Sequence, residues 1–153
     1  IERTPMLCMQ CDNPPCVPVC PTEATYKDSE GIVRVDQDKC IGDGACTAEC
    51  PYGARTLLET APESYFPGMA RNAQEKLQEE TFKKNKVSKC EFCYTRLEEG
   101  KAPACVQTCA AGARFFGDLD DPSSEVSRLI MSRGGEQMWA DLGTKPKVYY
   151  LPE

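Results

Sequence analysis

Residues 40–51 read Cys40-Ile-Gly-Asp-Gly-Ala-Cys46-Thr-Ala-Glu-Cys50-Pro51. The stretch follows a four-position pattern, Cys-x2-Cys-x2-Cys-x3-Cys-Pro, in which Asp43 stands at the second position. Two further cysteine clusters flank it: Cys8, Cys11, Cys16 and Cys20 before it, and Cys90, Cys93, Cys105 and Cys109 after it. All three clusters keep the opening x2 step and the final x3 step. The eleven cysteines of the chain therefore form a repeat, with Asp43 at the twelfth position.

This spacing is typical of loops that bind cubane iron–sulfur clusters. A short loop covers three corners of the cube with three thiolates, and the fourth thiolate is expected to begin a helix that leads to a neighbouring cluster. Gly42 and Gly44 allow the backbone to approach the sulfurs closely. A dry shell around the clusters is expected from four apolar side chains: Val17, Val19, Ile41 and Tyr52.

A similar tail follows each cysteine run, with an alanine four residues after the last cysteine: Ala24, Ala54 and Ala113. Strand-like residues come next, at 25–26, 56–58 and 115–116, and a further short strand is expected at 32–35. The repetition of cysteine loop, short helix and β-hairpin predicts an α+β fold of the bacterial ferredoxin type. Such a fold is rich in loops and is stabilised by its clusters.

The chain divides into four predicted segments. Residues 1–57 form a ferredoxin-like unit that holds two clusters, and 58–88 are a helical insertion with its helix over 69–86. Residues 89–120 carry the third cysteine motif, as part of a second ferredoxin-like unit. Residues 121–153 form a C-terminal helix and a strand or extended arm at 147–151, and Asp121 is the expected N-cap of the helix, which ends at Gly134 and Gly135.

Composition excludes several other classes of protein. The chain has 153 residues, no histidine and a formal net charge of −6. Without histidine there is no Ser-His-Asp catalysis, no Rieske centre and no His-ligated haem. An acidic chain is a poor ligand for the nucleic-acid backbone, and no apolar run is long enough for a membrane span.

Disulfides and zinc are the alternative uses of so many cysteines. A disulfide framework needs an even number of cysteines, whereas this chain has eleven. Cys90, Cys93, Cys105 and Cys109 would suit one tetrahedral zinc site, which makes a zinc-binding interaction module an alternative function. The regular spacing and the Cys-Pro steps of the first two motifs favour iron–sulfur clusters.

The stretches around the cysteines resemble a known family over residues 5 to about 120, on the motifs at 5–21, 38–42, 48–55, 89–101 and 103–109. They are similar to the iron–sulfur (electron-transfer) subunit of the dimethyl sulfoxide reductase family of molybdopterin oxidoreductases. They look most like the subunits of the polysulfide, thiosulfate, tetrathionate and arsenate respiratory reductases. The resemblance implies two ferredoxin units, 4Fe-4S clusters and a role in anaerobic respiration.

That resemblance also assigns the ligands. One 4Fe-4S cluster takes Cys8, Cys11, Cys16 and Cys50. The next takes Cys20, Cys40 and Cys46 with Asp43 at its fourth corner, either as an Asp-ligated 4Fe-4S cluster or as a 3Fe-4S cluster with that corner vacant. A third takes Cys90, Cys93 and Cys105, and Cys109 belongs to this cluster or to a fourth.

Family members of this kind carry four cysteine motifs, and the first of them is absent from this sequence. We therefore expect an upstream segment with a Cys-x2-Cys-x2-Cys-x3-Cys motif in the intact protein. The alternative is that the four cysteines of the third motif close one self-sufficient site.

By resemblance, the chain is a non-catalytic subunit that relays single electrons. Its partners would be a molybdopterin-containing catalytic subunit and a membrane quinone-linked anchor subunit or a cytochrome. Its place would be the periplasmic side of the cytoplasmic membrane, with a cytoplasmic location as the alternative. The alternative within electron transfer is a free-standing polyferredoxin. An enzyme that binds substrate at a labile iron beside Asp43 is disfavoured, because no set of acid–base groups surrounds residues 40–50.

Overall fold

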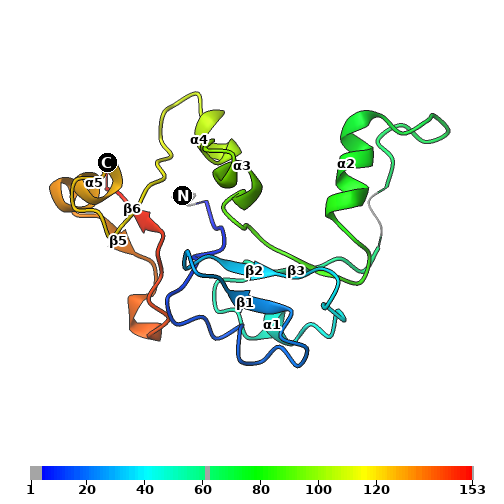
Figure 1. Cartoon of the computed structure of the whole chain (residues 1–153), viewed down its shortest axis with the longest axis horizontal. Helices are drawn as coiled ribbons and strands as arrows, with labels where there is room; N and C mark the ends of the chain where they lie inside the picture. Colours follow the sequence, from blue (N-terminus) through cyan, green and yellow to red (C-terminus); the bar gives the residue numbers. More distant parts are fainter. Residues whose placement is uncertain (1–4, 61–62, 153) are drawn as a thin grey trace. The chain divides into compact units, whose positions relative to one another are not determined.

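The computed structural model describes residues 5–60 and 63–152 (Figure 1). The chain divides into two compact units. Unit 1 comprises Ile1–Cys8 and Pro14–Lys89, and unit 2 comprises Met9–Asn13 and Cys90–Glu153. The structure is a small mixture of short helices and short strands, which agrees with the expected α+β class.

Two antiparallel hairpins form the frame of unit 1. Strand β1 (Thr25–Lys27) pairs with β2 (Val33–Val35), and Thr25 lies opposite Val35. The turn between them is closed by Asp28, whose Oδ1 accepts hydrogen bonds from the backbone N–H groups of Glu30 (3.0 Å) and Ile32 (2.8 Å). Both strands confirm the sequence prediction: Val33 and Val35 alternate in β2, and Thr25 and Tyr26 in β1 are residue types that favour strands.

The second hairpin joins β3 (Thr56–Leu57) to β4 (Val87–Ser88), which lie far apart in the sequence. Strand β3 was predicted and β4 was not. The connection contains α2 (Ala73–Thr81). This helix is shorter than the one predicted over 69–86, because it begins only after a capping box at Asn72 and Glu75.

Three short helices lie in the cysteine motifs: α1 (Ala45–Ala48), α3 (Tyr94–Glu98) and α4 (Ala104–Gln107). Helices α1 and α4 come before Cys50 and Cys109, whereas the sequence predicted that such cysteines would begin a helix. After each of these cysteines the chain turns: Gly53 N–H donates to the Cys50 carbonyl and Gly112 N–H to the Cys109 carbonyl, both at 3.1 Å. The expected position of the helix was therefore wrong.

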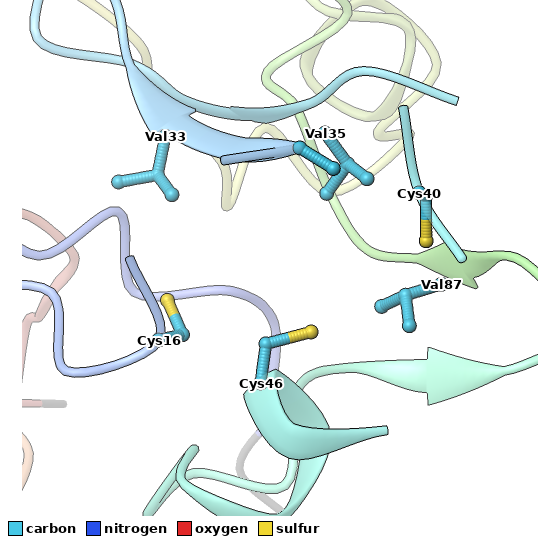
Figure 2. Packing of buried hydrophobic residues seen from close by; sticks show 7 residues of the cluster. Cys16, Val33, Val35, Cys40, Cys46 and Val87 are labelled. Atoms are coloured by element: carbon cyan, nitrogen blue, oxygen red, sulfur yellow. The ribbon is translucent and has the colours of Figure 1, made fainter. Parts of the chain in front are cut away.

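Valines and cysteines together form the core of unit 1 (Figure 2). Its buried members are Cys16, Ala24, Val33, Val35, Cys40, Cys46 and Val87. Val17 and Val19 pack against this core, and Tyr52 is buried, as the expected dry shell requires. Ile41 is 62% exposed, so its place in that shell was wrong.

Unit 2 contains α5 (Glu125–Arg133), the 3-10 turn η1 (Ala140–Leu142) and a hairpin of β5 (Glu136–Gln137) with β6 (Tyr149–Tyr150). The N-cap of α5 is Ser124, whose side chain accepts from the Ser127 N–H, and not Asp121. The helix ends at Gly134 in the left-handed conformation, as predicted. Strand β6 falls within the expected 147–151 segment.

Residues 115–116 were predicted to be a strand, and they are not one. Instead the Phe116 ring packs edge-to-face on the Phe92 ring, with centroids 5.2 Å apart. Met9–Asn13 is held within unit 2 by backbone hydrogen bonds, one of which runs from Asp12 N–H to the Lys145 carbonyl (2.8 Å). No helix in the part of the chain that the structure describes is long and apolar enough to cross a membrane.

Candidate metal centre

Cysteines from three separate stretches of unit 1 influence one another at Cys16. Burial raises the pKa of the Cys16 thiol, the Arg55 guanidinium acts in the opposite direction, and negative charge on Cys8 and on Cys50 raises the pKa further. Such mutual influence requires the three sulfurs to lie near one another. The structure therefore brings together three of the four ligands that the family resemblance assigned to the first cluster.

Arg55 is a buried residue of unit 1 that contacts this group of cysteines. Its side chain is only 3% exposed. One guanidinium nitrogen, Nη2, donates to the Cys16 sulfur at 3.1 Å, and Nη1 donates to the Thr25 hydroxyl oxygen at 3.1 Å. A hydrogen bond from a cationic donor is about twice as strong as a neutral one and favours the anionic form of its acceptor.

The second set of predicted ligands shares the core of unit 1. Cys46 is 4% exposed, Cys40 is also buried, and both project into the region that Val87 fills (Figure 2). Cys20 is half-buried and packs against the same core. Its sulfur accepts a hydrogen bond from the Thr25 N–H at 3.4 Å. Burial alone would raise the pKa of Cys20, but the hydrogen bonds from Thr25 and Thr22 outweigh burial and lower it.

Asp43 differs from the cysteines on either side of it, because its side chain is exposed. Its loop is tightly packed nonetheless. Gly42 has a φ of 74°, and a Cβ placed there would lie 2.1 Å from the Asn85 carbonyl oxygen. The Lys86 ammonium group donates to the Cys40 carbonyl oxygen, which also ties this loop to the segment before β4.

The third motif, in unit 2, is the most open of the three. Cys105 is exposed, and Cys90, Cys93 and Cys109 are half-buried. The Cys109 sulfur accepts from the Ala113 N–H at 3.3 Å, and this bond is the main reason why the pKa of Cys109 is lowered. The Gln10 side chain donates to the Cys90 carbonyl at 2.8 Å.

These donors fit iron–sulfur clusters in their chemistry. All eleven cysteines lie in the described part of the chain and carry free thiols, so the structure contains no disulfide framework. Within residues 5–60 and 63–152, no three Cys, Asp or Glu side chains are close enough to hold a single metal ion. A cubane cluster places its thiolates on separate corners, farther apart than the ligands of one ion. The sulfurs of Cys16, Cys20 and Cys109 accept N–H or guanidinium hydrogen bonds, and such bonds tune the sulfur ligands of iron–sulfur clusters.

Comparison with known proteins gives the family. Residues 1–62 and 75–119, more than half of the chain, match the family described as "4Fe-4S dicluster domain". The chain therefore belongs to this family. The family match also confirms 4Fe-4S clusters as the cofactors.

Several relatives are 44% identical to the chain. The B subunit of selenate reductase from Mesobacillus selenatarsenatis is matched over 97% of this chain and 54% of its own length, and the B subunit of sulfite dehydrogenase from Allochromatium vinosum over 97% and 55%. The B polypeptide of polysulfide reductase from Wolinella succinogenes is 38% identical over 95% of this chain and 64% of its own length. The chain thus spans between 54% and 64% of the length of these relatives.

Sequence reasoning missed Arg55 and Thr25 as parts of the site. The available signal was the tail after the last cysteine, which ends in arginine at both 55 and 114. Nothing in the local sequence distinguishes these two arginines, since only the fold buries the first of them.

Proposed function

We propose that this chain relays single electrons between a molybdopterin-containing catalytic subunit and a membrane quinone-linked anchor subunit or a cytochrome. The observation that carries the proposal is the meeting of Cys8, Cys16 and Cys50 beside the buried Arg55 guanidinium. A buried cation requires an anion close by, and a Cys16 thiolate bound to iron supplies one. The names of the relatives, which are subunits of reductases and of a dehydrogenase, support the same role.

We propose the ligand sets that the family resemblance implies, and the arrangement around Cys16 supports the first of them. Cys8, Cys16 and Cys50 hold one 4Fe-4S cluster, to which the sequence motif adds Cys11. Cys20, Cys40 and Cys46 hold the second. The exposure of Asp43 supports the form of that second cluster in which the corner beside Asp43 is vacant, that is, a 3Fe-4S cluster.

In unit 2, Cys90, Cys93 and Cys105 hold a third cluster, with Cys109 as its fourth ligand or as a ligand of a fourth cluster. The exposure of Cys105 leaves that end of the motif open. We propose that the electron passes in succession through the clusters of unit 1 and the cluster of the third motif.

The residues of the chain act on the cofactors rather than on a substrate. Bound clusters take up and release one electron at a time. Val33, Val35 and Val87 keep water away from the sulfurs, and the N–H of Thr25 and the guanidinium of Arg55 hold the thiolates in place. We therefore propose a non-catalytic subunit, which acts in a complex on the periplasmic side of the cytoplasmic membrane, and the substrate reacts in the partner.

Metal and sulfide analysis of the intact protein, purified without oxygen, tests this function. We expect a brown protein with acid-labile sulfide in about the same amount as iron, which copurifies with a molybdenum-containing protein. Zinc without sulfide would favour the interaction module instead. A cluster-loaded chain that stays monomeric and binds no molybdoprotein would favour the free-standing polyferredoxin.

Electron paramagnetic resonance of the oxidised protein tests the assignment at Asp43. A vacant corner predicts the signal of an oxidised three-iron cluster. The variant Asp43→Cys restores the full four-position pattern and is expected to remove that signal, whereas Asp38→Cys, at an exposed position outside the pattern, is expected to leave it unchanged. A fully oxidised wild-type protein without the signal would contradict the vacant corner.

A further inference from the structure

Arg55 is a buried arginine with few polar contacts. It is almost completely buried, and its charged head contacts two groups, the Thr25 hydroxyl and the Cys16 sulfur. In the part of the chain that the structure describes, no carboxylate forms an ion pair with this guanidinium. Arginine stays charged at every physiological pH, and of its two contacts only the Cys16 sulfur can carry a balancing negative charge, as a thiolate.

We propose that Arg55 sets the reduction potential of the cluster that Cys16 ligates, by placing a fixed positive charge against the ligand sulfur. The inference rests on the proposed function, in which Cys8, Cys16 and Cys50 bind that cluster. Arg55 is a positioning residue, because it acts through the sulfur and touches no substrate.

The direction of the effect follows from the charge balance. One electron enters from a one-electron donor, no proton is taken up and no bond is made or broken, so the cluster and its thiolates become more negative by one charge. A nearby positive charge stabilises this reduced form more than the oxidised form. Arg55 therefore raises the reduction potential, and salt screens the effect little because the pair is buried.

Thr25 makes the placement of the charge specific. The planar guanidinium has donors on two sides, so it can bond the Thr25 hydroxyl with Nη1 while Nη2 remains 3.1 Å from the Cys16 sulfur. Thr25 is buried on β1 and also donates its N–H to Cys20. The strand thereby fixes the distance between the positive charge and the ligand sulfur.

The chain supplies its own control for the charge. Arg114 occupies the same place in the repeated tail, five residues after Cys109, but it is exposed. Arg114→Gln removes one equal charge from the protein without touching Cys16. Any effect of Arg55→Gln that Arg114→Gln lacks at this cluster is due to the buried position.

The test is a redox titration of the full-length, cluster-loaded chain with iron and sulfide content measured in parallel. Cys16→Ser first identifies the reduction wave that belongs to the Cys16 cluster. In Arg55→Gln we expect the equilibrium constant for reduction of this cluster to fall about tenfold. For a one-electron couple this moves the wave to lower potential by about 59 mV. Arg55→Lys keeps the charge but loses the fork, so it is expected to give a smaller shift, and Arg114→Gln is expected to leave the wave in place.

An unmoved wave in Arg55→Gln, with full iron and sulfide, would overturn the inference and leave the proposed function standing. If Arg55→Gln does not assemble its clusters, Arg55→Lys and Thr25→Val decide the matter, and a wild-type potential in both would overturn it. A wild-type chain without sulfide would overturn the proposed function itself, and the inference with it. A shift that is equal in Arg55→Gln and Arg114→Gln would also overturn it, since the effect would then come from net charge.

Discussion

The tails that follow Cys50 in unit 1 and Cys109 in unit 2 have nearly the same sequence and nearly the same turn. Gly53 and Gly112 hold φ angles of 58° and 59°, and each donates its N–H to the cysteine three residues earlier at 3.1 Å. The two tails differ in burial: Arg55 is buried, whereas Arg114 is exposed. The repeated sequence thus encodes the turn and does not encode the environment of the cysteine.

Non-local pairing explains the difference. In unit 1 the tail continues into β3, which pairs with β4 from far along the chain, and Val87 of β4 fills the core. The matching residues of unit 2, Phe115 and Phe116, form no strand and are 41% and 37% exposed. Cysteines surrounded by a core have their potential controlled by that core, whereas open cysteines depend on what binds beside them.

Loss of a ligand is the largest expected difference between the two regions. Cys16→Ser removes a core sulfur and the partner of Arg55, so we expect loss of one cluster's iron and faster amide exchange in the β1–β2 hairpin. Cys105→Ser affects an exposed residue and should lose iron from the third motif without changing exchange in that hairpin. Iron analysis and hydrogen exchange measure both effects. Equal disturbance of the hairpin by the two variants would contradict the comparison.

Glycine substitutions give the next largest effect. Gly42→Ala places a methyl group 2.1 Å from the Asn85 carbonyl oxygen at a φ of 74°, and we expect a loss of about 3 kcal/mol in the free energy of local opening. Gly112→Ala also falls at a positive φ, but nothing lies within 4 Å, so about 1 kcal/mol is expected. Native-state hydrogen exchange in each unit measures these losses, and a larger loss for Gly112→Ala would reverse the comparison.

Truncation of a valine side chain is expected to give a smaller difference in stability between unit 1 and unit 2. Val33 is 1% exposed in the core of unit 1, and Val33→Ala should cost about 2 kcal/mol, because it removes buried methyl groups and leaves a cavity. Val106→Ala, beside Cys105 in a half-buried position, should cost less than about 1 kcal/mol. The two variants are compared by amide exchange of β2 and of α4. A cost for Val106→Ala that equals that of Val33→Ala would show that the third motif has a core of its own.

Local sequence predicted the elements whose signals are local. β-branched, aromatic and other apolar residues marked β1, β2 and β3, and Gly134 marked the end of α5. Strand β4 was missed because two residues, Val87 and Ser88, carry no visible alternation. The N-cap of α5 was assigned to Asp121 although Ser124, closer to the first turn, performs that role.

The candidate site shows the same limit. The family resemblance, which rests on the cysteine motifs, assigned Cys8 and Cys50 to the same cluster as Cys16, and both influence the Cys16 thiol in the structure. Arg55 could not be found in this way, since its burial depends on Thr25 and Cys16, which are 30 and 39 residues away in the sequence. Ile41 was placed in the dry shell wrongly, because it follows the buried Cys40 in a loop and faces outward.

The smallest expected effect concerns acid, and it distinguishes a helix of unit 1 from a helix of unit 2. The first turn of α2 depends on the Glu75 carboxylate, which accepts from the backbone N–H of Asn72 (2.8 Å), the Ser64 hydroxyl (2.8 Å) and the Tyr65 N–H (2.7 Å). These hydrogen bonds hold the pKa of Glu75 below its usual range, and the bond from the Asn72 N–H has the largest effect. A lowered folded-state pKa adds stability above the ordinary glutamate pKa, and that stability is lost as the pH falls through the lowered value.

Helix α5 begins at a cap that does not titrate, the Ser124 hydroxyl, which accepts from the Ser127 N–H at 3.2 Å. Acid should therefore loosen the start of α2 before it loosens the start of α5, as amide exchange measured against pH would report. Glu75→Gln should remove the pH dependence in α2, because an amide keeps one acceptor oxygen but has no charge to lose. An acid response of α2 that persists in Glu75→Gln would place its origin in other carboxylates, and equal responses of α2 and α5 in the wild type would remove this difference between the units.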